Sequence, residues 1–157
     1  MAKQEKINYL RLDKINSADY IESVVNKTAP LLAGHFVKLG KVVNPAQGEV
    51  VECTLAASGT DYDALVAPVY IDQGFSDFVE HLHSVPAGKP ARALILEPGS
   101  IVSFAKDQVK GAQTGDKVEI GDDGFGLKKA ASGDGIGEVI AEEPQRVVGG
   151  LVVVRFK

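Results

Sequence analysis

Residues Gly111–Lys157 read GAQTGDKVEIGDDGFGLKKAASGDGIGEVIAEEPQRVVGGLVVVRFK, a succession of short apolar runs separated by glycine-based turns. Val118 and Ile120 alternate with charged residues, and the other runs alternate in the same way. Because successive side chains of a strand point to opposite faces, this period of two predicts half-buried antiparallel strands. Four strands are expected here, at Asp116–Ile120, Phe125–Lys129, Ile136–Ile140 and Leu151–Phe156.

The middle of the chain continues the same rhythm. Its expected strands are rich in β-branched residues and are bounded by glycine and proline; they lie at Ala33–Leu39, Lys41–Val43, Glu49–Leu55, Ala64–Ile71, Pro90–Leu96 and Ile101–Ala105. Many short strands with few helices predict a mainly β protein, a small antiparallel β-barrel or sandwich with one or two short helices and an N-terminal arm.

The two expected helices lie at Asp19–Val25, with Ser17 as its cap, and at Phe75–His83, where apolar residues recur at helical spacing. Residues 1–30 contain no glycine and mix basic with large apolar side chains. Two interpretations of this segment are open: an arm that reaches a partner, or a strand–helix extension that packs on the barrel. We therefore expect an extension at 1–30 and a β-rich barrel or sandwich domain at 31–157.

Composition excludes several classes of function. The chain has 157 residues, a net charge of −4, no tryptophan and no long basic block, which disfavours a nucleic-acid partner. No apolar run approaches the length of a membrane span, and the N-terminus lacks the apolar core of a signal peptide. A single cysteine, Cys53, cannot form an intrachain disulfide, which suits a reducing cytosol or any compartment where no disulfide is needed.

Candidate chemistry is sparse, and no catalytic or cofactor-binding residue is predicted. His81 and His83 would lie on one face of a strand, a spacing that some metal sites use, but on a helix the two rings would diverge. The run from Gly121 to Gly124 is typical of a hairpin turn, and it lacks the spaced ligands of a calcium loop. Ser100, Ser103 and Cys53 lie in no nucleophile motif. We therefore expect no metal, no cofactor and no enzymatic activity.

A series of short motifs resembles a known family. It comprises Ala87–Pro90, Thr114–Val118, a hairpin at Gly124, Leu127–Ala130, Gly135–Val139 and Gly149–Val154. This order resembles the head decoration, or capsid cement, proteins of tailed bacteriophages, in which a G-D-x-V strand precedes a hairpin, an I-G-x-V strand and a glycine-led apolar strand. The resemblance covers the last third of the chain and extends loosely into its middle.

The resemblance implies a structural protein, made in the host cytoplasm, that binds the outer surface of a phage capsid and stabilises it. It implies the major capsid protein as partner and a homo-oligomer, a trimer or a dimer. The contact with the capsid would come from the N-terminal residues Lys3, Lys6, Ile7, Tyr9, Leu10, Arg11 and Lys14, and a subunit interface from Phe75, Phe78 and Leu82.

Two alternatives remain open at this point. One is another β-rich part of the virion, such as a tail-tube or head-completion subunit. The other is a small metal-binding β-barrel enzyme that uses His35, His81 or His83.

Overall fold

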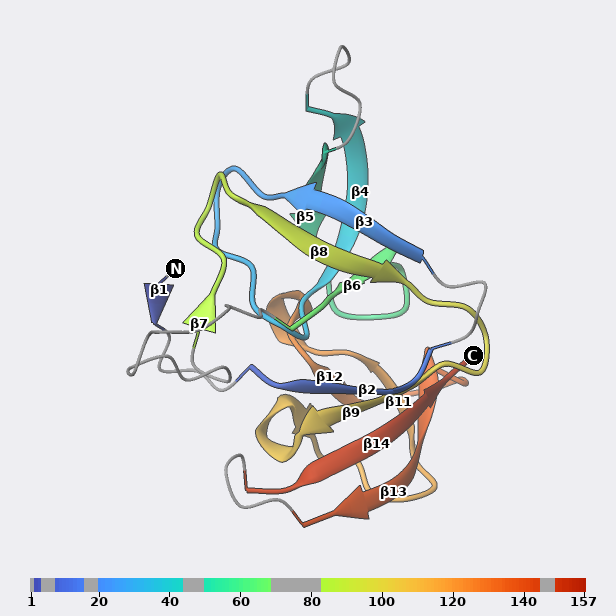
Figure 1. Cartoon of the computed structure of the whole chain (residues 1–157). Helices are drawn as coiled ribbons and strands as arrows, with labels where there is room; N and C mark the ends of the chain where they lie inside the picture. The colour runs from blue at the N-terminus through green and yellow to red at the C-terminus, as the bar shows by residue number, and fades with distance from the viewer. Residues whose placement is uncertain (1, 4–7, 16–19, 44–49, 69–82, 145–148) are drawn as a thin grey trace.

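The computed structural model describes residues 2–3, 8–15, 20–43, 50–68, 83–144 and 149–157. These residues form a closed five-stranded barrel that stands on a curved seven-stranded sheet (Figure 1). The prediction of a mainly β fold with a small barrel is confirmed. Two short 3-10 helices, η2 (Lys106–Gln108) and η3 (Asp122–Gly124), are the helices within the described ranges.

The seven-stranded sheet has the order β10-β12-β11-β13-β14-β9-β2. Its strands are antiparallel except for the pair β10–β12. Their bounds are Leu10–Lys14 (β2), Ile101–Ala105 (β9), Val109–Lys110 (β10), Lys117–Ile120 (β11), Leu127–Lys129 (β12), Gly137–Glu143 (β13) and Leu151–Phe156 (β14). Residues Gly111–Lys157 thus supply four of the seven strands, β11 to β14, which agrees with the four strands expected from the alternation of their side chains.

The barrel closes in the order β3-β5-β4-β6-β8, with β3 and β5 parallel and the other described pairs antiparallel. Its strands are Tyr20–Val25 (β3), Phe36–Val42 (β4), Val50–Leu55 (β5), Ala64–Val66 (β6) and Pro90–Ile95 (β8). Small side chains such as Ala64, Ala91 and Ala93 fill the interior with Val24 and Val66, because five strands enclose little space. A separate two-stranded pair joins β1 (Ala2–Lys3) to β7 (His83–Ser84).

One hydrophobic core lies between the barrel and the sheet. Phe36 of β4 and Leu65 of β6 are fully buried and pack with Phe104 and Phe156 of the sheet. The ring centroids of Phe36 lie 6.3 Å from those of both Phe104 and Phe156. The barrel and the sheet therefore share a core.

Gln108 ties three segments together beside this core. Its side chain is 2 % exposed; Nε2 donates to the carbonyl of Ala33 at 3.0 Å, and Oε1 accepts from the amide of Tyr9 at 2.8 Å. Gly34 lies against the same amide group, because a Cβ there would be 2.4 Å from Nε2 of Gln108. The N-terminal segment, the loop before β4 and the end of η2 are thus held at one buried point.

The helix expected at Asp19–Val25 is wrong for the residues that the structure describes. Tyr20–Val25 forms β3, paired on one side with β5 and on the other with β8. Backbone hydrogen bonds to two neighbours outweigh the weak local preference for a helical turn. Within the first thirty residues, β2 belongs to the sheet and β3 to the barrel. The helix expected at Phe75–His83 lies outside the described residues, apart from His83, which is in β7.

Candidate functional site

Arg11, one of the predicted contact residues, lies at the centre of an ion-pair cluster on the outer face of the sheet. Its Nε is 2.5 Å from Oδ1 of Asp13, and its Nη2 is 2.7 Å from Oε2 of Glu143 and 3.2 Å from Oγ of Ser103. Glu143 belongs to β13, so the pair reaches across β14 and β9. Hydrogen bonds to Asp13 and then to Glu143 raise the pKa of Arg11 above its ordinary value. Two carboxylates therefore already neutralise this guanidinium.

The same cluster explains why side chains on the outer face are buried. Ser103 and Ala105 alternate with the core residues Val102 and Phe104, so they point away from the core, yet neither is exposed. Ser103 donates its hydroxyl to Asp13 and accepts from Arg11. Tyr9 packs against Ala105 and Leu151. The chain's own side chains thus cover the part of the outer face around Ser103 and Ala105.

The remaining predicted capsid-contact residues lie in different environments. Leu10 is 1 % exposed and belongs to the core, so its assignment as a capsid contact is wrong: the alternation of β2 directs Leu10 and Leu12 inward. Lys14 is exposed at the end of β2. Lys3 lies in β1. The other predicted contact and interface residues lie outside the described residues; they are Lys6, Ile7, Phe75, Phe78 and Leu82.

His35 supports the loop that leads into the barrel. It is 7 % exposed, its Nδ1 accepts a hydrogen bond from the amide of Leu32 at 2.9 Å, and its ring meets the edge of Phe125 at 5.2 Å. His83 lies in β7 and His81 lies outside the described ranges. Among the residues that the structure describes, no group of three or more histidine, cysteine or acidic side chains is placed to hold a metal ion. No described helix is long and apolar enough to cross a membrane.

Cys53 and the two serines considered as nucleophiles are buried. Cys53 points into the barrel and is 5 % exposed, and this burial raises the pKa of its thiol to about 11. Ser100 and Ser103 have no exposed surface, and Ser103 is committed to Arg11 and Asp13. A protonated, buried thiol is a poor nucleophile, because the thiolate is the reactive form.

An open depression beside η2 and η3 carries mixed charge. Lys106, Lys110 and Lys128 line it together with Asp107 and Asp122. Lys128 donates hydrogen bonds to Asp122 at 3.2 Å and to Ser58 at 3.0 Å. The hydrogen bond from Lys128 to Asp122 lowers the pKa of the Asp122 carboxyl. The run from Gly121 to Gly124 forms the turn between β11 and β12, as the sequence predicts.

Two features of this geometry had no local signal in the sequence. Gln108 is one polar residue at the end of η2, and its importance comes from Tyr9 and Ala33, which are distant along the chain. Arg11 and Glu143 are separated by 132 positions, 143 minus 11. Only the tertiary structure brings each of these groups together.

Comparison with known proteins gives a match in structure. No protein-family model matches the sequence, and no curated protein sequence is detectably similar to it. The fold is similar to that of a solved structure described as the head fiber gp8.5 N base in bacteriophage phi29, with a TM-score of 0.54 and 15 % sequence identity. The match covers 88 % of this chain and 94 % of that chain. The two proteins therefore share a fold over nearly their whole length.

Proposed function

We propose that this chain is a structural protein of a phage virion that binds the outer surface of the head and stabilises it, as decoration or cement proteins do. The observation that carries the proposal is the likeness to the head fiber base, which extends over 88 % of this chain and so includes both the barrel and the sheet. The motif order of Gly111–Lys157, read from the sequence alone, resembles that of head decoration proteins and so also favours a protein associated with the phage head.

The build of the molecule suits a load-bearing role. The barrel and the sheet share one aromatic core, and the Arg11 cluster links β2 to β13 across two intervening strands. A rigid body of this kind loses little conformational entropy when it binds. Many such bodies on one shell act together, because each contact is made at high effective concentration.

The proposal names the major capsid protein as partner and a trimer or dimer as the assembled form, and it assigns no reaction to the chain. Of the N-terminal residues, Lys3, Lys6, Ile7 and Lys14 stay proposed as capsid contacts. Tyr9 and Arg11 are engaged with Leu151 and Glu143, and Leu10 is in the core.

The test is binding to heads. Heads are purified from the encoding phage after deletion of the gene for this chain, mixed with the purified chain and sedimented, and their release of DNA on heating is then measured. We expect saturable binding and a higher temperature of release. Rings or tubes in negative stain without binding to heads would favour a tail-tube or head-completion subunit instead. Stoichiometric zinc, iron or copper in the purified chain would favour an enzyme.

A further inference from the structure

Exposed apolar side chains gather at one end of the barrel. Among the described residues, the large hydrophobic side chains that are exposed are Ile21 (56 %), Val43 (41 %) and Val42 (38 %). Ile21 lies on β3, Val42 is the last residue of β4, and Val43 follows it where β4 pairs with β5. This end of β4 extends from the barrel on the side away from β13 and β14 (Figure 1).

Strand register places most of these side chains in one continuous band. Ser23 of β3 pairs with Val50 of β5, and the amide of Val43 donates to the carbonyl of Val50 at 2.8 Å. Ile21 precedes Ser23 by two positions and therefore shares its face. We call Ile21, Ser23, Val50 and Val43 the barrel-end band. The band is mostly apolar, and it extends from β3 over β5 to the residue that follows β4.

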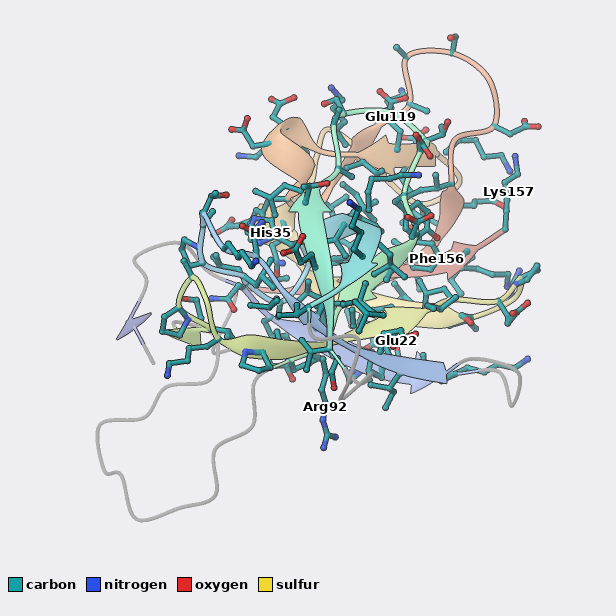
Figure 2. The ribbon with its side chains drawn as sticks, turned by 90° about the horizontal axis from the view of Figure 1, so that it is seen from above. Glu22, His35, Arg92, Glu119, Phe156 and Lys157 are labelled. Carbon is teal, nitrogen blue, oxygen red and sulfur yellow. The ribbon has the colours of Figure 1, made fainter. Side chains whose placement is uncertain are left out.

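Two positive charges flank the barrel-end band. Arg92 of β8 pairs in register with Ser23, and its side chain extends away from the body of the protein (Figure 2). Lys41 lies on β4, two positions before Val43, and is exposed. Neither forms an ion pair with a described carboxylate.

Two other lysines, Lys27 beside β3 and Lys38 on β4, are paired with carboxylates. Lys27 lies 2.5 Å from Glu52, and Lys38 lies 2.7 Å from Asp61. The positive charge that remains uncompensated on the barrel therefore includes Arg92 and Lys41, beside the band. The chain as a whole is acidic, with a net charge of −4.

We propose that the barrel-end band, with Arg92 and Lys41, docks on an acidic and partly apolar surface of the head's shell protein. This inference rests on the proposed function and adds a contact that is separate from the N-terminal residues. The apolar side chains would be removed from water in the contact, and the two cations would meet carboxylates and orient the encounter. A two-fold pairing of this face with itself would instead bring the cations of both copies together, which opposes self-association.

The experiment measures binding of three full-length variants to the same gene-deleted heads. Arg92→Glu reverses one flanking charge, and Ile21→Glu places a charge within the band. Arg155→Glu is the matched control, because Arg155 is also exposed and forms no ion pair with a described carboxylate, but it lies on β14 of the sheet. Circular dichroism and thermal melting verify that each variant is folded.

We expect Arg92→Glu and Ile21→Glu each to weaken binding about tenfold, as loss of a central contact does, while Arg155→Glu stays within about twofold. Raising the salt concentration should weaken binding of the unchanged chain more than that of Arg92→Glu. If the unchanged chain and all three variants bind alike, the inference is overturned and the proposed function stands. If the unchanged chain does not bind heads, both the inference and the proposed function are overturned. If Ile21→Glu instead abolishes self-association seen by sedimentation velocity, the face binds a second copy and the inference is wrong.

Discussion

Gly126 and Gly133 have similar backbone conformations in very different surroundings. Both adopt positive φ, 65° and 73°. A Cβ at Gly126 would lie 2.2 Å from the carbonyl oxygen of Gln108, whereas nothing lies within 4 Å of a Cβ at Gly133. Gly133→Ala should cost about 1 kcal/mol of unfolding free energy from backbone strain alone. Gly126→Ala should cost roughly 1–3 kcal/mol more, because the backbone of η2 must move. Urea denaturation of both variants checks this, and equal losses would contradict it.

At the same scale, Cys53 should react slowly and only on unfolding. Burial raises the pKa of its thiol to about 11 from the ordinary value of 9.0. Between these two values the unfolded chain ionises its thiol and the folded chain does not, so this group lowers stability as pH rises from 9 to about 11. The stability advantage of the natural chain over Cys53→Ala should therefore shrink across that interval. A thiol reagent at pH 8 should label the native protein far more slowly than the urea-unfolded protein; rapid labelling of the native protein would contradict the burial.

At the scale of elements, the Arg11 cluster links the edge strand β2 to β13, the middle strand of the sheet. Arg11 meets Glu143 at 2.7 Å, with both side chains about two-fifths exposed. A double-mutant cycle of Arg11→Met and Glu143→Gln should give a coupling energy of about 1 kcal/mol, because hydrogen bonds to Ser103 and Asp13 fix the guanidinium. The isolated pair of Lys117 with Glu138, similarly exposed at 3.2 Å, is the control and should give about 0.3 kcal/mol. Equal couplings would show that the cluster adds nothing to a simple surface pair.

At the scale of the whole molecule, the shared core predicts a single unfolding transition. Phe36 belongs to the barrel but packs on Phe104 and Phe156 of the sheet. Phe36→Ala should therefore lower the unfolding free energy by about 3–5 kcal/mol and increase amide exchange in the barrel and the sheet together. If the barrel amides alone lost protection, the two parts would be independent units.

The proposed contact between the N-terminal residues and the capsid is also tested on the whole molecule. Asn8 accepts a hydrogen bond from the amide of Ala33 at 3.2 Å, and β2 begins two residues later. A chain that lacks residues 1–7 should therefore keep its sheet, since Asn8, Tyr9 and Leu10 stay in place. Under the proposed function it should bind heads more weakly than the complete chain, measured by sedimentation. Undiminished binding would remove Lys3, Lys6 and Ile7 from the contact.

The strands of the last third were predictable because their signal is local. Leu151–Phe156 has the predicted bounds, and Val118 and Ile120 are both buried, as their alternation indicates. The assignment of Tyr20–Val25 to a helix failed because that segment is decided by β5 and β8, which lie far along the chain. The choice of capsid-contact residues was limited for the same reason. The sequence shows that Leu10 is apolar and Arg11 is basic, but it does not show which face of β2 packs on the core.

The sequence by itself determined that this protein is made of short strands and glycine turns, since side-chain alternation and left-handed turn residues act over a few positions. Only the tertiary structure decided that five strands close into a barrel and that seven form the sheet beneath it. It also decided that Arg11 pairs with Glu143, whereas Arg92 and Lys41 form no ion pair with a described carboxylate. The reason is physical: strand pairing and charge compensation depend on partners distant in the chain, and a local sequence pattern contains no information about those partners.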